Sequence, residues 1–250
     1  MKSKVKFISI ILIVCATVWF LIYSCAVKDP IAPFAPEPGS TGGGSTGGGS
    51  TGDGSGGGGG GGSITYKFDW ETAGDNLFWM RQTYTDSQAI TNVSQTSAAT
   101  PGAFHGRGYL KCMVHAIPFH ANYSKGETFV DLQNALGVAQ NLSGKGVIMY
   151  VYCPSGAHGT NNAPNGLQIF FKDANWNNAY GRWKNIGEAV PLNQWTKISQ
   201  ICTANASDYD YFQPGFDPTR VRAIGLKYGT SGEGNAKAYD GPIYIDAVNW

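Results

Sequence analysis

Hydrophobic and polar side chains alternate along short segments of this chain, and the three- to four-residue period of a helix is nearly absent. In LQIFFK (residues 167–172) the first, third and fifth side chains face one side of a strand, and Gln168, Phe170 and Lys172 face the other. Similar segments recur between clusters of Gly, Pro, Asn and Asp. They span residues 64–70, 108–115, 146–153, 167–172, 196–202, 221–228 and 242–248. Many strands separated by turn signals predict an all-β fold, a β-sandwich jelly roll.

The N-terminus departs from this pattern. Three lysines among residues 2–6 precede an apolar run over residues 7–23, which ends at Ser24-Cys25. A basic start, an apolar stretch and a small residue at a cleavage position indicate a secretory signal over residues 1–24. The residues before Cys25 resemble a bacterial lipobox, which implies that Cys25 is lipidated and is the mature N-terminus. The run is also at the lower limit of a bilayer span, so an uncleaved anchor is the alternative. Either way, we expect an exported chain held at the membrane of a bacterial cell envelope.

Two kinds of linker follow. Residues 26–38 carry four prolines without a helical or strand period, and residues 39–63 consist of 16 Gly, five Ser, three Thr and one Asp. The first segment reads as an extended tether. The second has no apolar side chains to bury and behaves as a flexible coil. We therefore expect a disordered linker over residues 25–63, which leaves residues 64–250 as one folded domain.

The domain is electrically neutral and rich in aromatic residues. It holds 14 Lys and Arg against 14 Asp and Glu, and six of the seven Trp. Nucleic-acid recognition needs a basic face, so a nucleic-acid partner is not expected. An uncharged polar ligand suits the composition better. Cys112, Cys153 and Cys202 have no metal-like spacing, and one disulfide or three free thiols are both compatible with the sequence.

Several segments, taken in order, point to a known family. They read YKFDWETAGDNLFW, HGRGYLKC, GLQIFFKDANW, FDPTRVRAIGLKYGT and AYDGPIYIDAVNW. In this order they resemble the jelly-roll carbohydrate-binding modules of bacterial glycan-degrading enzymes, over nearly all of residues 64–250. The resemblance implies a β-sandwich that binds polysaccharide and performs no catalysis.

The resemblance also implies a structural Ca²⁺ that joins the first and last strands. By position, Glu71 and Asp246 would be its carboxylate ligands and Asp69 a further candidate. Carbonyl oxygens would come from residues 106–111, including the backbone of Lys111. Calcium takes six to eight oxygen ligands, which fits such a set. The alternative is an ordinary salt bridge from Asp246 to Lys111 or Arg107.

The segment KDANWNNAYGRWKN (residues 172–185) places large rings in a polar, glycine-broken stretch. In the modules that the chain resembles, this region carries sugar-stacking tryptophans, which implies stacking by Trp176 and Trp183 with Tyr180 between them. The C–H face of a sugar ring packs on an aromatic face, and its hydroxyls need directional donors and acceptors. The alternative is that a ring caps the core. The further candidate binding residues are Gln168, Lys172, Arg182, Tyr150 and Tyr152, the last two either on the binding face or in the core.

The function that we predict is binding of a neutral polysaccharide, such as a β-linked mannan or glucan, with separately encoded glycan-active enzymes as candidate partners. One alternative is an envelope adhesion or structural lipoprotein that binds a protein through its aromatic residues. Another is a glycan-cleaving enzyme, which would need two carboxylates about 5–10 Å apart. Asp208 and Asp210 come closest to such a pair, but they lie in a turn-like segment far from the aromatic stretch in sequence.

Overall fold

The computed structural model describes residues 66–84 and 86–250. The predicted signal peptide, the lipidation site at Cys25 and the linker lie outside the described residues. Within the described part of the chain, no helix has both the length and the apolar character needed to cross a bilayer.

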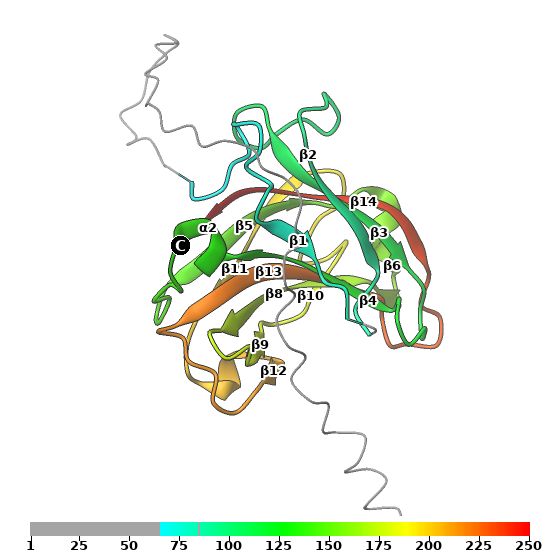
Figure 1. Cartoon of the computed structure of the whole chain (residues 1–250). Coiled ribbons are helices and arrows are strands. Elements are labelled where there is room, and N and C mark those ends of the chain that lie inside the picture. The colour runs from blue at the N-terminus through cyan, green and yellow to red at the C-terminus, as the bar shows by residue number, and fades with distance from the viewer. Residues whose placement is uncertain (1–65, 85) are drawn as a thin grey trace, which may run out of the picture. The chain divides into compact units, whose positions relative to one another are not determined.

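Two antiparallel sheets form the domain and lie in separate layers (Figure 1). The first sheet has the order β1-β4-β13-β8-β9-β12, with β10 also paired to β8. Its strands are β1 (Trp79–Arg81), β4 (Lys125–Asp131), β13 (Val221–Gly229), β8 (Gly166–Asp173), β9 (Asn178–Tyr180), β12 (Tyr211–Phe212) and β10 (Lys184–Asn185).

The second sheet has the order β11-β5-β14-β3-β2. Its strands are β11 (Trp195–Ile201), β5 (Gly146–Tyr152), β14 (Tyr239–Asn249), β3 (Tyr109–Ala116) and β2 (Ile90–Thr96). Shorter elements complete the described chain: the pair β6 (Gly159–Thr160) and β7 (Ala163–Pro164), the helix α2 (Leu132–Leu136), and the 3₁₀ turns η1 (Ser155–His158) and η2 (Ala206–Asp208).

The core lies between the two sheets and takes every second side chain of the long strands. From the first sheet these are Leu167, Ile169 and Phe171 of β8 and Ile224, Leu226 and Tyr228 of β13. From the second they are Leu110, Cys112 and Val114 of β3, Val147, Met149 and Val151 of β5, and Ile243 and Ile245 of β14. The predicted β-sandwich is confirmed, because both sheets bury one face against each other.

The three cysteines of the domain are free thiols. Cys112, Cys153 and Cys202 are all buried. Burial disfavours the charged thiolate and raises the pKa of each to about 12. Of the two alternatives left by the sequence, the structure therefore has the free thiols, which pack as small apolar side chains.

Six of the seven predicted strands are present, and the first is not. Residues 64–70 were expected to form a strand, but the described part of this segment joins β14 only through an isolated bridge between Phe68 and Val248. Trp70 then turns the backbone into the left-handed region, with φ of 55°. Its ring is fully buried. The segment is therefore anchored by a buried tryptophan and a single bridge.

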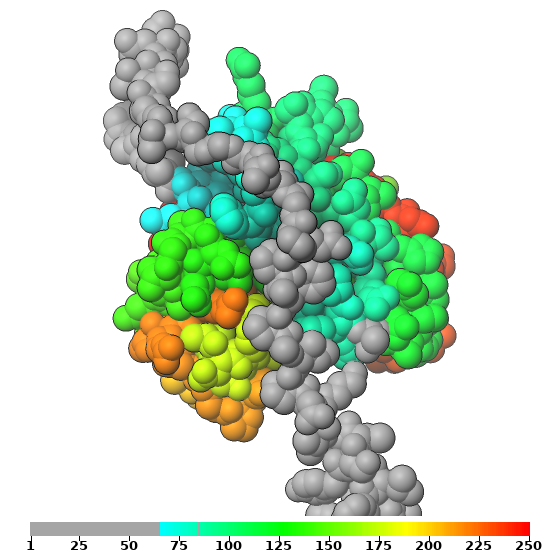
Figure 2. Space-filling model, in the orientation of Figure 1, coloured from blue at the N-terminus to red at the C-terminus, as the bar shows by residue number. Residues whose placement is uncertain are grey.

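The sequence pattern missed two seven-residue strands, β2 (ITNVSQT) and β4. The strand β4 reads KGETFVD. Its inward positions are Gly126, Thr128 and Val130, so only one of the three is strongly apolar. The helix α2 follows it directly: the Asp131 carboxylate accepts a hydrogen bond from Asn134 N, and Gly137 ends the helix at φ 79°. In Figure 2 the green surface that includes α2 lies beside the yellow-green turn after β8 and the orange residues before β13. A hydrogen bond from Ala174 N to Arg220 O joins the last two segments.

The outer side of β13 is built from small residues where its neighbours carry large ones. Gly225 pairs with Phe129 on β4 and with Phe170 on β8. A methyl group on Gly225 would lie 2.6 Å from Cζ of Phe170 and against the Thr128 carbonyl oxygen. Glycine at this position is what allows the two phenylalanines to lie beside each other over the sheet.

We predict that Gly225→Ala destabilises the domain by about 1–3 kcal/mol, because the added methyl overpacks the sheet against backbone. Urea unfolding followed by circular dichroism measures the change. Gly146→Ala, in β5, is the matched control: nothing lies within 4 Å of its added methyl, and we expect no loss. Equal stability of the Gly225 and Gly146 variants would contradict the packing argument.

Candidate functional site

A row of cross-strand neighbours crosses the outer face of the first sheet from edge to edge. Register pairs one residue from each strand along this row. We call it the aromatic band: Met80, Phe129, Gly225, Phe170, Tyr180 and Tyr211. Ring centroids are 6.5 Å apart for Phe129 and Phe170, 5.5 Å for Phe170 and Tyr180, and 5.7 Å for Tyr180 and Tyr211. The middle of the band is buried, whereas Met80 and Tyr211 at its two ends are exposed.

A buried ion pair lies against the aromatic band. Lys172 Nζ is 3.1 Å from Glu127 Oε2, and both side chains are less than 5% exposed. The Tyr180 hydroxyl donates to Glu127 Oε1 at 2.7 Å, and Lys172 Nζ lies 5.2 Å from the Phe129 ring centroid and 5.1 Å from that of Phe170. Burial and the Glu127 charge raise the pKa of Tyr180, so its proton stays on the hydroxyl. The pair therefore fixes the orientation of Tyr180.

Gln168 and Lys172 lie on the outer face, as the alternation predicts, but both are covered. Gln168 is 4% exposed and Lys172 is 2% exposed. The Gln168 side-chain amide donates to Gly181 O at 3.0 Å and to Asp210 Oδ2 at 3.1 Å. Instead of reaching solvent, these two predicted binding residues support the side chains above them.

Asp210 organises the segment that carries Trp183. Its carboxylate accepts from Trp183 N at 2.7 Å and from Arg182 Nη1 at 3.0 Å, in addition to Gln168. Arg182 is exposed and also donates to Ser207 O. Sequence reasoning set Asp210 aside as distant from the aromatic stretch. Pairing of β12 with β9 brings it there, and no local pattern in the sequence signals that pairing.

The Trp183 indole packs against the backbone of two glycines, Gly166 and Gly229. A methyl group on Gly229 would be 2.9 Å from Cη2 of the indole, and one on Gly166 would be 2.5 Å from Cζ2. The indole Nε1 donates to Asn185 Oδ1 at 2.9 Å, and the ring is half-buried. It lines an open hollow of about 240 Å³ together with Phe119, Ser124, Lys125, Lys227, Gly229, Thr230, Ser231 and Gly232. Trp183 therefore offers a fixed apolar surface beside polar side chains.

Trp176 lies near the other end of β8. Its backbone is left-handed, with φ of 65°. The ring packs edge-on against Phe129, at 6.4 Å between centroids, and the Arg222 guanidinium lies 4.5 Å from its centroid. Arg222 in turn pairs with Asp131 at 3.1 Å. Since Trp183 packs at Gly166 and Trp176 follows Asp173, the length of β8 separates the two rings by on the order of 20 Å.

Tyr150 and Tyr152 lie on the opposite side of the sandwich from these tryptophans. Both belong to β5 of the second sheet, and Val147, Met149 and Val151 of that strand point into the core. The two tyrosines therefore face outward on the second sheet. They do not lie around Trp183 and do not pack between the sheets. The core alternative is therefore wrong for them, and a binding role stays a prediction.

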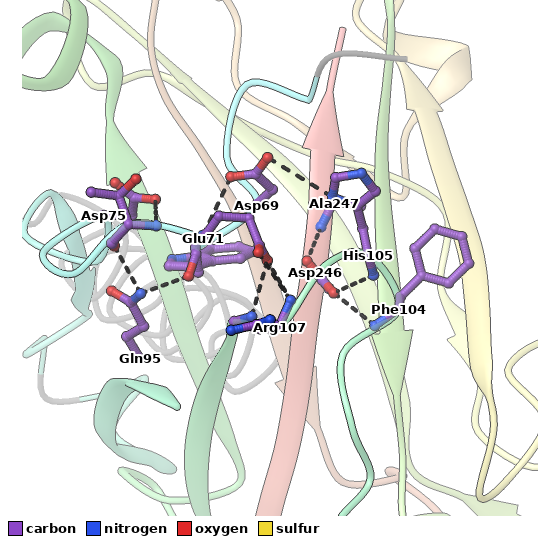
Figure 3. A network of polar contacts seen from close by, with 12 residues as sticks. Asp69, Glu71, Asp75, Gln95, Phe104, His105, Arg107, Asp246 and Ala247 are labelled. Atoms are coloured by element: carbon purple, nitrogen blue, oxygen red, sulfur yellow. Dashed lines mark hydrogen bonds and ion pairs between the residues drawn. The ribbon is translucent and has the colours of Figure 1, made fainter. Parts of the chain in front are cut away.

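The predicted calcium ligands hold a loop through its backbone (Figure 3). The Asp246 carboxylate accepts from Phe104 N at 2.8 Å and His105 N at 3.0 Å through Oδ2, and from Ala247 N at 2.7 Å through Oδ1. The Glu71 carboxylate accepts from Arg107 N at 2.8 Å and Gly108 N at 3.0 Å. Two carboxylates thus hold residues 104–108 by four backbone N–H groups.

Both carboxylates are occupied by backbone N–H groups of the loop. Lys111 lies in β3 between β2 and β14. Asp69 Oδ2 lies 3.9 Å from His105 Nδ1. In residues 66–84 and 86–250, no three His, Cys, Asp or Glu side chains are grouped to hold a metal ion. Nor does Asp246 form an ion pair with Lys111 or Arg107 there. The calcium site stays a prediction.

Searches with family models and among curated proteins find no match. Solved structures do resemble the chain. One, on carbohydrate-binding modules from the β-sandwich superfamily, has 21% identity and a TM-score of 0.45, and the match covers 74% of this chain and 61% of that one. Another is CBM27-1 of Caldicellulosiruptor saccharolyticus with mannohexaose, at 17% identity and a TM-score of 0.44, over 74% of this chain and 96% of that one.

An agarase matches at 10% identity and a TM-score of 0.46, over 74% of this chain and 26% of the agarase. The similarity to carbohydrate-binding modules that the ordered motifs predict is thus also found among solved structures.

Asp246 makes the stability of the domain dependent on pH. Burial raises the pKa of its carboxyl to about 6, against the lowering effect of the hydrogen bonds from His105, Ala247 and Phe104. Between its folded and ordinary pKa values the Asp246 carboxyl is protonated in the folded state and ionised in the unfolded state, so the folded state gains stability as the pH falls. In metal-free buffer, we expect the free energy of unfolding to rise by up to about 3 kcal/mol from pH 7 to pH 4. Urea unfolding at a series of pH values measures it, and Asp246→Asn should remove this rise.

The calcium prediction has a thermal test. Saturating Ca²⁺ should raise Tm at pH 7 by roughly 5–10 °C over a chelated sample, if it binds the folded state alone. Glu71→Gln or Asp246→Asn should abolish this increase, and Glu233→Gln, an exposed acid elsewhere, should keep it. A Tm that ignores Ca²⁺ in the unaltered protein would reject the site.

Proposed function

We propose that this domain binds a neutral polysaccharide, without catalysis, on the outer face of its first sheet. The observation that carries the proposal is Trp183, whose indole rests on Gly166 and Gly229 and lines an open hollow. A large ring held on bare backbone beside an open hollow is poorly explained as core packing. It suits a flat apolar partner such as the C–H face of a sugar ring.

The polar side chains around the hollow suit the rest of a sugar. The Nζ atom of Lys227 is 4.6 Å from the Tyr180 ring centroid. Burial lowers the pKa of this ammonium group. Lys125 is 3.5 Å from Asp86, and Thr230 donates to Ser124 O at 3.1 Å. These groups offer directional donors and acceptors to hydroxyls. The domain as a whole carries no net charge, which suits a neutral ligand.

The positions of the two tryptophans suggest the path of the polysaccharide. Trp183 packs at the start of β8, and Trp176 follows its end. A glycan chain laid along β8 and β13 would contact Trp183 first, then the surface formed by Lys227 and Tyr180, and finally Trp176. β-linked mannan and glucan have extended chains that suit such a straight path, and we propose them as the ligand class.

We also propose an exported, membrane-held location. The basic and apolar N-terminus, the lipobox-like residues before Cys25 and the Gly/Ser-rich segment support it. In this arrangement a lipid anchor holds the domain at a bacterial envelope, and the linker lets it reach polysaccharide there. Separately encoded glycan-active enzymes would be the partners that use the captured chain.

The test is binding of purified protein to mannan, glucomannan, β-glucan and xylan oligosaccharides of increasing length, by calorimetry and tryptophan fluorescence. We expect saturable binding to at least one ligand. Trp183→Ala should weaken it at least tenfold, about 1.4 kcal/mol, and Trp183→Phe should weaken it less, because a smaller ring keeps part of the stacking area. Trp176→Ala should weaken binding only of the longer oligosaccharides.

Lys197→Ala, on the second sheet, is the control and should leave binding of these neutral ligands unchanged. Circular dichroism and thermal unfolding show that each variant is folded. Binding that Trp183→Ala leaves intact would place the site elsewhere. A folded protein that binds no member of the panel would reject glycan capture and favour a protein partner at the exposed aromatic residues.

A further inference from the structure

The outer face of the second sheet carries its own aromatic cluster, far from Trp183 across the core. Four rings from four strands meet edge to face, and we call them the rear cluster: Tyr109, Tyr152, Trp195 and Tyr244. Tyr109 is 5.9 Å from Trp195 and 5.5 Å from Tyr244 between ring centroids, and Tyr152 is 5.7 Å from Trp195 and 5.9 Å from Tyr244. Each side chain points outward, because its strand neighbours fill the core.

The rear cluster is anchored on one side and open on the other. Tyr109 is fully buried, and its hydroxyl donates to Ala98 O at 2.9 Å. Trp195 Nε1 donates to Gly102 O at 3.0 Å. Tyr152 and Tyr244 remain partly exposed, and their hydroxyls form no hydrogen bond with any part of the chain that the structure describes. The buried half therefore fixes the rings, and the open half presents two phenols with unused hydrogen-bonding capacity.

Two lysines flank the open half. Lys111 on β3 is the direct cross-strand neighbour of Tyr244, and Lys197 on β11 is that of Tyr150, next to Tyr152. Neither lysine has an ion-pair partner among residues 66–84 and 86–250. Directly opposed residues in an antiparallel pair have Cβ atoms about 4.5–5.5 Å apart, so the amines reach the space above the rings.

Acidic groups on this face are already occupied. Asp240 pairs with His115 at 3.0 Å, and Asp246 is buried with three backbone N–H groups on its carboxylate. Neither acid is therefore paired with Lys111 or Lys197. The charge complement of two ammonium groups without an acidic partner is an anion.

We propose that the rear cluster is a second glycan-binding surface, which takes an acidic polysaccharide built from uronic-acid units. Tyr152 and Tyr244 stack on the sugar rings and offer their hydroxyls to sugar hydroxyls. Lys111 and Lys197 pair with the carboxylates, one on each side of the rings. The proposal goes beyond neutral-glycan binding on the first sheet and does not depend on it.

The experiment measures binding of purified protein to polygalacturonate and, in parallel, to the neutral glycan panel, by affinity electrophoresis and calorimetry. We expect polygalacturonate binding that weakens as salt rises. The double variant Lys111→Gln/Lys197→Gln should weaken it at least tenfold, and Tyr152→Ala/Tyr244→Ala should do the same at low salt. The lysine pair is the safer variant for folding, since both side chains reach the surface.

Trp183→Ala separates the two surfaces and should leave polygalacturonate binding unchanged. Failure of the unaltered protein to bind polygalacturonate overturns the rear surface and leaves neutral-glycan binding as it stands. Binding that survives the lysine double variant, or that is lost in Trp183→Ala, also overturns it. Retained polygalacturonate binding with no neutral-glycan binding would instead reject the first-sheet site and keep the rear one.

Discussion

The inter-sheet core accepts only every second side chain of each strand, and this constraint shapes both outer faces. Leu167, Ile169 and Phe171 fill the core from β8, so Gln168, Phe170 and Lys172 must find partners on the other side. On the first sheet those partners are other side chains of the same face. The result is a thin second layer of packed rings and charges, on which Trp176 and Tyr180 rest.

The charged part of that layer needs its aromatic surroundings. A buried ion pair gains little unless its remaining hydrogen-bonding capacity is used, because removing two charges from water is costly. The Glu127 carboxylate pairs with Lys172 and accepts hydrogen bonds from the Tyr180 and Ser87 hydroxyls. The Lys172 ammonium group lies against the rings of Phe129, Phe170 and Tyr84. The network therefore depends on Gly225, whose missing side chain lets the two phenylalanine rings close over the sheet. A change in one member would be felt by the others.

Local pattern and tertiary pairing contributed different parts of this structure. Alternation in β8 correctly assigned which side chains face out, and the repeated short segments correctly indicated a β-sandwich. Alternation also placed Tyr150 and Tyr152 on one side of β5, but it carries no information on which sheet β5 joins. The sequence pattern missed β4 because two of its three inward positions, Gly126 and Thr128, are not strongly apolar. The contact of Asp210 with Trp183 was missed because only the pairing of β12 with β9 brings the two residues together.

The packing of the Trp183 indole on two glycines has a consequence for the thermodynamics of glycan binding. An exposed aromatic side chain normally samples several rotamers, and a ligand that binds it must overcome the lost conformational entropy, about 0.5–1.5 kcal/mol for each immobilised side chain. This indole packs against the backbone of Gly166 and Gly229, and Asn185 holds its Nε1. The entropy of ordering this ring is therefore lost during folding, and a ligand meets a rigid surface that requires no rearrangement before contact.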